Sequence, residues 1–337
     1  MFASAHAASS QGAGKPSSVE APRYTQRGDV AAWIADTSFQ LAMPVERIEA
    51  VLSQARYSPE AARFILPTSP TVQRSWRAYR SRFVEPVRLN EGQRFWDTHR
   101  IALARAEAKW GVPAEVIVAI IGIETLYGRQ QGNFRALDVL ATLGFDWPTE
   151  APRDRSAFFR DQLAELLALA REQNIEPQSF KSSYAGAIGL PQFMPGSIRA
   201  FAVDFDNDGH VDLRNTPTDA IGSVANFLVQ HGWVRDMPVW FSARLTGESA
   251  QIEPLIAHDL IASYEDANLR EAGMSCAVDR NYNGPLGVVD LVTPDEPTAY
   301  RCATPNFFAI TQYNRSFFYA GAVAELALAL RAERRAP

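Results

Sequence analysis

Pro113-Ala-Glu-Val-Ile-Val-Ala-Ile-Ile-Gly-Ile-Glu-Thr-Leu-Tyr-Gly-Arg129 reads as a helix that is buried on every face. Proline suits the first turn of a helix, and Gly128 suits its end. Residues 116–123 are apolar all round, as expected of a helix in a protein interior. Glu124 is the ionisable group that interrupts this run. Burial raises the pKa of a carboxyl and makes it usable as a general acid near neutral pH. The alternative is a glutamate that turns out to solvent at the helix end.

The composition indicates a globular protein with a large core. The 337 residues are 47% hydrophobic and 21% charged, and the formal net charge is −5. Such a chain has room for about two or three subdomains. The charge does not indicate nucleic-acid binding, although local contacts can still bind a neutral or anionic polymer. No stretch approaches the length of a membrane span, and the histidines lack the spacing of a zinc site.

The N-terminal residues 1–26 are expected to form a disordered tail. Ala5-His6-Ala7 has the form of a signal-peptidase site, without the basic and apolar regions that precede one. We interpret this segment as a signal-peptide remnant, with a simple flexible tail as the alternative. No cysteine lies near the start, so a lipid-anchored N-terminal cysteine is not expected. Cys276 and Cys302 would bridge in an oxidising compartment and remain two thiols in the cytosol.

Hydrophobic periodicity predicts a mainly α chain of the α+β class. Helices are expected to begin near Asp29, Pro44 and Asn90, the last running to Trp110. Further helices are expected at residues 76–83, 136–143, 156–173, 219–232 and 317–334. Alternating residues predict strands at 238–245, 286–292 and 300–310. The predicted units are an N-terminal helical subdomain (27–105), a core (106–237), a small β-containing insertion (238–305) and a C-terminal segment that completes the core (306–334).

Residues 204–219 resemble an EF-hand calcium loop. Aspartates occupy positions 1, 3 and 5, and Gly209 occupies position 6, where a sharp turn is needed. Position 12 is Asn215 instead of glutamate, so the carboxylate that closes the site would come from a longer loop. Asp212 can contribute directly or through water. The alternative is a solvated turn, and the flanking helices favour calcium. The expected ligands are Asp204, Asp206, Asp208, the backbone carbonyl of His210, and Asp219.

The segment 183–197 offers groups suited to a carbohydrate. Its small residues let the backbone approach a ligand closely, Ser183 and Gln192 can hydrogen-bond hydroxyls or amides, and Tyr184 and Phe193 present flat faces. A tight structural turn is the alternative.

A second segment, 311–319, combines amide and aromatic groups in Tyr313, Asn314 and Tyr319. These side chains suit a sugar, or they satisfy one another beside a core helix.

Five ordered motifs resemble the lytic murein transglycosylase B family, glycoside hydrolase family 103. The resemblance covers roughly residues 27–330 and implies a lysozyme-like core at 106–237. The motifs are Ile-Glu-Thr-x-Tyr-Gly, Ser-x-Ala-Gly-Ala-x-Gly-x-x-Gln-Phe-Met-Pro, the Asp-rich loop, Asp-Ala-Ile-Gly-Ser-Val-Ala-Asn at 219–226, and Tyr-Asn-x-Ser.

By this resemblance, Glu124 is the single catalytic acid and base. Three departures from the family pattern stand out. Loop 149–153 differs in length, Phe227 stands where a tyrosine is often found, and the calcium loop is one residue longer. The residues expected to line the glycan cleft are Ser183, Gln192, Tyr313, Asn314, Tyr319, Tyr79 and Arg155.

The implied reaction is non-hydrolytic cleavage of the β-1,4 bond between N-acetylmuramic acid and N-acetylglucosamine, with formation of a 1,6-anhydro ring. The alternatives are a hydrolytic muramidase with the same acid and a non-catalytic, calcium-dependent glycan-binding protein. The resemblance further implies a structural calcium ion and no organic cofactor. The expected partners are peptidoglycan strands and other cell-wall enzymes, bound by a soluble periplasmic monomer without a membrane anchor.

Overall fold

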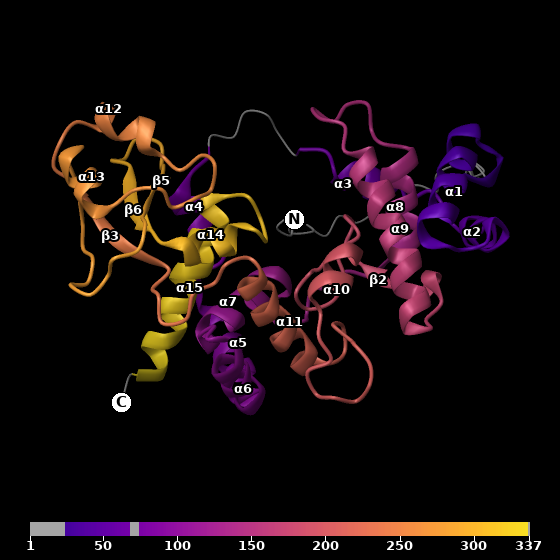
Figure 1. The fold of residues 1–337 in the computed structure, drawn as a ribbon, viewed down its shortest axis with the longest axis horizontal. Coiled ribbons are helices and arrows are strands. Elements are labelled where there is room, and N and C mark those ends of the chain that lie inside the picture. The colour runs from indigo at the N-terminus through magenta and orange to yellow at the C-terminus, as the bar shows by residue number, and fades with distance from the viewer. Residues whose placement is uncertain (1–23, 68–73, 336–337) are drawn as a thin grey trace, which may run out of the picture.

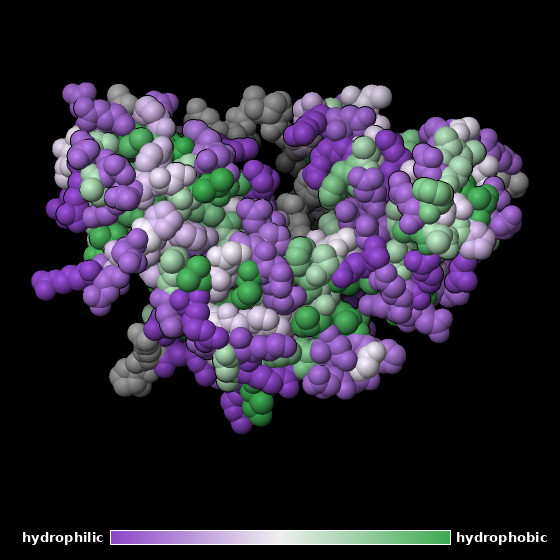
Figure 2. Space-filling view, viewed as in Figure 1, coloured by the Kyte–Doolittle hydropathy of each residue, from purple (hydrophilic) through white to green (hydrophobic). Residues whose placement is uncertain are grey.

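The described residues form two groups of elements. The computed structural model describes residues 24–67 and 74–335, and Figure 1 shows one group on each side of the molecule. Helix α10 (Pro195–Phe201) packs against both groups. Figure 2 shows that the surface is hollowed between them. Of the expected tail, residues 1–23 lie outside the described residues. Tyr24–Gln26, in contrast, form a 3₁₀ helix (η1) in which Tyr24 is buried.

The first group is helical and carries one wall of the hollow (right in Figure 1). Helix α8 packs on α9 and α3, and α1 packs on α2. The apolar spacing that predicted α1, α2, α8 and α9 faces this core, where Ile34, Ile48 and Leu163 are buried. Helix α3 was not predicted. The bounds are α1 Gly28–Leu41, α2 Val45–Leu52, α3 Pro59–Phe64, α8 Ala136–Phe145 and α9 Ser156–Gln173. The predicted bounds of α9 are confirmed.

The second group surrounds the apolar helix α7 (Ala114–Thr125), all of whose residues except Glu115 are buried. Helices α5, α6, α11 and α15 pack against it, so the expectation of burial on every face is confirmed. Helices α4 and α14 also belong to this group. The bounds are α4 Trp76–Arg80, α5 Pro86–Thr98, α6 Arg100–Trp110, α11 Pro217–Gln230, α14 Pro305–Thr311 and α15 Phe317–Arg335.

Two predicted elements of this group were wrong in detail. The helix expected from Asn90 to Trp110 is two helices, because His99 leaves helical geometry with φ −109° and ψ 20°. The strand expected at 300–310 ends at Ala303. Thr304 then caps α14 by accepting a hydrogen bond from the Asn306 amide, and Pro305 fits the first helical position.

A four-stranded antiparallel sheet forms the small β-containing unit, with strand order β4-β3-β6-β5. Its core is separate from the main one and includes Phe241, Leu269 and Val288. Cys276 and Cys302 form a disulfide there, with their Cα atoms 5.9 Å apart. The bounds are β3 Trp240–Leu245, α12 Ser249–Ile252, η3 Glu253–Leu255, α13 Asp266–Glu271, β4 Met274–Cys276, β5 Gly287–Leu291 and β6 Ala299–Ala303.

A short ribbon lies in the first group, beside α8. Strand β1 (Phe134–Arg135) pairs antiparallel with β2 (Lys181–Ser182), and the 3₁₀ helix η2 (Pro177–Ser179) precedes β2. This pairing places the start of the glycine-rich segment 183–197 directly after β2. Within residues 24–67 and 74–335, none of the helices has the length and hydropathy needed to cross a membrane.

Candidate active site

Glu124 lies in the last turn of α7 and is only 5% exposed. Burial raises the pKa of Glu124 to about 7, whereas a hydrogen bond from Tyr319 opposes the shift. The Tyr319 hydroxyl donates to Glu124 Oε1 at 2.6 Å. The alternative of a solvent-facing glutamate is therefore wrong. A buried carboxyl with a pKa near 7 can both give and take a proton at neutral pH.

The helix ends at Thr125, one residue after Glu124 and earlier than Gly128 had suggested. Leu126, Tyr127 and Gly128 all adopt left-handed backbone conformations, with φ of 48°, 58° and 89°. The Thr125 hydroxyl holds this turn, since it accepts from the Gly128 amide at 3.0 Å and donates to the Leu190 carbonyl at 2.9 Å. Two non-glycine residues in this region cost conformational energy, which these contacts offset.

Tyr127 and Arg88 fasten the end of α7 to α5. A Cβ on Gly92 of α5 or Gly122 of α7 would lie 2.4 or 2.5 Å from the Tyr127 hydroxyl, so both glycines are needed to admit the ring. That hydroxyl donates to the Arg88 carbonyl at 3.0 Å. The buried Arg88 guanidinium donates to the Gly122 carbonyl at 2.9 Å. Glu124 is thus mounted on a rigid helix end.

Glu124 lines a pocket of about 240 Å³ that unites several of the expected site residues. It lies between the end of α7, the start of α9, the glycine-rich segment and the chain between α14 and α15. Four of the residues expected to bind substrate are in its wall, namely Arg155, Ser183, Gln192 and Tyr313. The other lining residues are Phe158, Gln162, Ala185, Ala187, Met194, Ser197, Gln312 and Arg315.

Hydrogen bonds within the glycine-rich segment determine which atoms of Gln192 and Ser183 are available to a ligand. Gln192 has a left-handed φ of 51°, and its amide nitrogen donates to the Gly189 carbonyl at 2.9 Å. Its amide oxygen is therefore the atom that can accept from a ligand. The Ser183 hydroxyl oxygen accepts from the Ala187 amide at 3.2 Å, so its hydrogen can donate outward.

Tyr313 lines the same pocket and has a buried hydroxyl. The residue is 1% exposed, and its hydroxyl has no hydrogen-bond partner among the described residues. Its ring packs on Phe227 and Phe193, with centroids 4.4 and 5.8 Å away. An unsatisfied buried hydroxyl costs free energy until a partner arrives.

The remaining expected residues lie outside the pocket lining. Tyr319 reaches Glu124 itself. Tyr79 packs between Phe83 and Phe318, with centroids 5.0 and 5.7 Å away. Burial raises its pKa, and the nearby Glu124 carboxylate adds to the effect. Asn314 is partly exposed, and the structure does not bring it into this pocket.

Sequence reasoning missed Gln162, Gln312 and Arg315 in the pocket and Arg88 behind it. Arg315 occupies the variable position of Tyr-Asn-x-Ser, and its neighbours in the chain could have indicated it. Gln162 lies in an amphipathic helix, where a glutamine usually faces water. The burial of Arg88 depends on tertiary contacts that no local pattern records.

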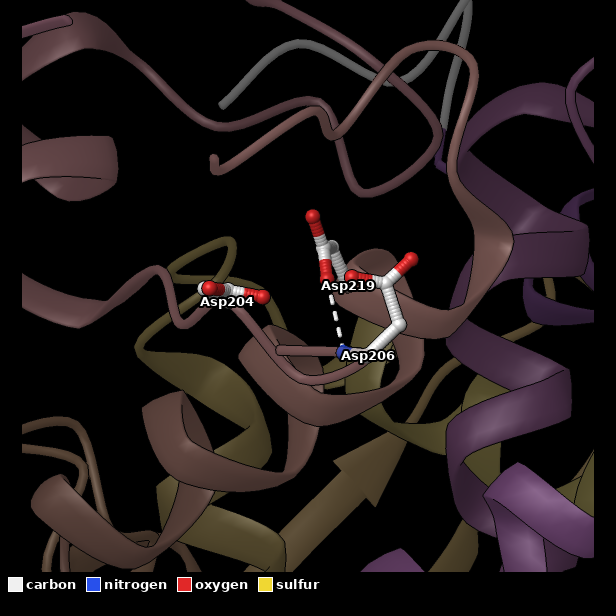
Figure 3. A group of neighbouring side chains, drawn as sticks. All are labelled: Asp204, Asp206 and Asp219. Atoms are coloured by element: carbon white, nitrogen blue, oxygen red, sulfur yellow. Dashed lines mark hydrogen bonds between the residues drawn. The ribbon is translucent and has the colours of Figure 1, made fainter. Parts of the chain in front are cut away.

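The aspartate-rich segment 204–219, called the acidic loop below, brings three carboxylates together, as Figure 3 shows. Asp204, Asp206 and Asp219 each offer an oxygen within 4.8 Å of the others. Asp219, in the first turn of α11, is 1% exposed. Its two oxygens accept from the backbone amides of Phe205 (2.8 Å) and Asp212 (2.9 Å), which ties the loop to the helix.

Asp208 and His210 stand outside this three-carboxylate group. Asp208 accepts from the His210 amide at 2.8 Å. Gly209 has φ 94° and donates its amide to Asp204 at 2.9 Å, which gives the expected sharp turn. The three grouped side chains thus all offer hard carboxylate oxygens, the type that calcium prefers.

Comparison with known proteins identifies the family. Residues 29–328 match the transglycosylase SLT domain family. The chain is 37% identical over 302 residues to membrane-bound lytic murein transglycosylase B of Escherichia coli strain K12, covering 86% of this chain and 79% of that protein. The chain belongs to the lytic murein transglycosylase B family. The resemblance inferred from the five motifs is confirmed.

Solved structures of this transglycosylase family share the fold. Soluble lytic transglycosylase SltB1 of Pseudomonas aeruginosa is 40% identical, with a TM-score of 0.82 over 91% of this chain and 100% of that chain. E. coli lytic transglycosylase Slt35 in complex with calcium is 34% identical, with a TM-score of 0.78 over 94% of each chain. The predicted mainly α, lysozyme-like fold is confirmed.

Proposed function

We propose that this protein is a peptidoglycan lytic transglycosylase that cleaves the β-1,4 bond between N-acetylmuramic acid and N-acetylglucosamine. The observation that carries the proposal is Glu124, a lone buried carboxyl with a pKa of about 7 in a pocket lined by hydroxyl, amide and guanidinium groups. Membership of the lytic murein transglycosylase B family supports the same substrate and reaction.

In the first step, protonated Glu124 donates its proton to the glycosidic oxygen as the bond to C1 breaks. The 2-acetamido group of the substrate stabilises the positive charge at C1, as in substrate-assisted glycosidases. Such a scheme needs no carboxylate nucleophile. Among the described residues that line the pocket, Glu124 is the only acid.

In the second step, ionised Glu124 takes the proton from the C6 hydroxyl of the muramic acid. The C6 oxygen attacks C1 and closes the 1,6-anhydro ring, so no water is consumed and Glu124 regains its proton. The Tyr319 hydroxyl stabilises the ionised form between the two steps by donating to Oε1.

The pocket side chains supply complementary contacts for the substrate. The Ser183 hydroxyl donates and the Gln192 amide oxygen accepts, which matches the carbonyl and N–H of an acetamido group. The buried Tyr313 hydroxyl gains a partner when a sugar binds. Ser183 is favoured over Asn314 as the residue that holds the acetamido group, because Ser183 lines the pocket and Asn314 does not.

Digestion of purified peptidoglycan by wild type and Glu124→Gln, with mass spectrometry of the products, tests this function. Wild type is expected to release 1,6-anhydro products, and Glu124→Gln to lose at least about a thousandfold in rate. Glu115→Gln, on the same helix, is the matched control and should retain activity. Reducing ends instead of anhydro ends would identify a hydrolytic muramidase. Unchanged lysis by Glu124→Gln would exclude the assigned acid.

The acidic loop is proposed to hold a structural calcium ion. Asp204, Asp206 and Asp219 already converge, and Asp208 and the carbonyl of His210 would complete the shell. The calcium complex of Slt35 supports this choice of ion. Bound calcium would neutralise the mutual repulsion of these carboxylates and stabilise the loop.

The periplasm is the proposed compartment, with peptidoglycan strands and other cell-wall enzymes as partners of a monomeric enzyme. The disulfide between Cys276 and Cys302 supports an oxidising location.

A further inference from the structure

An aromatic pair, one ring exposed and the other half-buried, lies next to the pocket of Glu124. Phe64, the last residue of α3, is 41% exposed. Its ring meets that of Tyr184 edge to face, with centroids 5.7 Å apart. The guanidinium carbon of Arg63 lies 4.7 Å from the centroid of the Phe64 ring. We call Arg63, Phe64 and Tyr184 the aromatic ledge.

The aromatic ledge is continuous with the pocket through the backbone. Tyr184 stands between Ser183 and Ala185, and both of these residues line the pocket of Glu124. The Ser183 amide donates to the Ala187 carbonyl at 2.8 Å, and the Gly186 amide donates to the Ser183 carbonyl at 3.0 Å. These bonds fix the backbone of Tyr184 relative to the pocket.

The other half of the ledge is equally well anchored. Ala61 and Ala62 of α3 are buried, and α3 packs against α8. The Ser58 hydroxyl caps α3 by accepting from the Ala61 amide. Figure 1 shows α3 on the side of its group that faces the second group. Phe64 therefore stands on a helix that is fixed by its cap and by its packing on α8.

The ledge combines the two kinds of group that recognise a sugar. Aromatic rings pack against the C–H face of a pyranose, and a guanidinium donates to hydroxyl, acetamide or carboxylate oxygens. A single exposed phenylalanine needs no explanation. Here the second ring, the cation and the continuity with the pocket distinguish Phe64 from Phe39, which is 89% exposed on α1.

We propose that Arg63, Phe64 and Tyr184 form an outer glycan subsite, which binds a sugar unit of the strand whose scissile bond lies at Glu124. The inference rests on the proposed function and extends it to strand length. A strand too short to reach the ledge is cleaved without its help. Longer strands gain binding energy from it, so the enzyme prefers them.

The test measures kcat/KM on stem-free alternating glycan strands of four, six, eight and ten sugars, for wild type, Phe64→Ala and the control Phe39→Ala. Wild type and Phe39→Ala should show the same rise with length. Phe64→Ala should match them on the shortest strand and lose about tenfold on the longest, as expected for a lost aromatic contact. Tyr184→Leu, on the other ring, should show the same pattern, and melting temperatures check that each variant is folded.

The outcomes separate the subsite from the proposed function. If wild type releases no anhydro products from any strand, the function itself fails. If wild type is active and folded Phe64→Ala and Tyr184→Leu lose nothing, or lose equally at every length, the outer subsite is wrong. If the loss appears only on strands that carry stem peptides, measured in parallel at equal length, the ledge binds peptide and the glycan assignment is overturned.

Discussion

Replacing Glu124 by glutamine should stabilise the folded protein above neutral pH. The replacement keeps the shape of the side chain and its contact with Tyr319 but removes the buried titration. Below pH 4.5, Glu124 is protonated in both the folded and the unfolded chain. Between pH 4.5 and about 7, the unfolded chain releases this proton while the folded chain keeps it. The free energy of unfolding of the wild type therefore falls across this window, and the full penalty is present above it.

The size of the effect follows from the shift. The pKa of Glu124 rises from 4.5 to about 7, and each unit corresponds to about 1.4 kcal/mol. Relative to wild type, Glu124→Gln should thus gain about 3 kcal/mol between pH 4 and pH 8. Such a gain is a large fraction of the stability of a typical domain. A gain in stability together with a loss of activity is expected, because active-site residues are often destabilising for the folded protein.

Urea unfolding followed by circular dichroism at pH 4, 6 and 8 measures this difference. Glu115→Gln is the matched control, since Glu115 lies on the same helix but is ion-paired with Arg331 at 3.3 Å. This control removes a charge that has a partner and should not gain stability as the pH rises. A free-energy difference for Glu124→Gln that is the same at pH 4 and pH 8 would refute the raised pKa and the reasoning from burial.

Two further predictions concern the partner of Glu124 and the acidic loop. Tyr319→Phe removes the hydrogen bond that lowers the pKa of Glu124, so the upper limb of the pH profile of kcat should move to higher pH and the rate should fall about tenfold. An unmoved limb would argue against that contact. A calcium chelator should lower the melting temperature of wild type, and Asp204→Ala should abolish this response. If the chelator does not change the melting temperature of wild type, the loop holds no calcium.

The helical part of the fold was largely predictable because its signals are local. The apolar spacing of α9 gave its bounds, and the continuous apolar run of α7 gave its burial. Local signals failed where a single residue changed the backbone direction. Nothing in the sequence around His99 marks the break between α5 and α6. At 300–310 the alternating residues outweighed Pro305, although a proline after a threonine is typical of a helix start.

The site was predictable to the extent that its chemistry is written in short motifs. Glu124 stood out as one acid in an apolar helix, and the turn at Gly209 followed from the spacing of the aspartates. Gln162 and Arg88 gave no such signal, because their roles depend on which distant backbone they meet. Asn314 shows the converse. Its motif suggested the pocket, but the turn after α14 leaves it outside the lining.

The end of α7 shows why local rules fail at the point that matters most for chemistry. Glycine at 128 suggested a helix through Tyr127, yet the helix ends at Thr125, with Leu126 and Tyr127 in left-handed conformations. This early end lets the Thr125 hydroxyl bond both the Gly128 amide and the Leu190 carbonyl. Glu124 is thereby fixed against the segment that carries Ser183 and Gln192. The left-handed turn costs backbone free energy, and in return it holds the acid in a rigid position. Conflicts between local backbone preference and the overall fold are expected at functional sites of this kind.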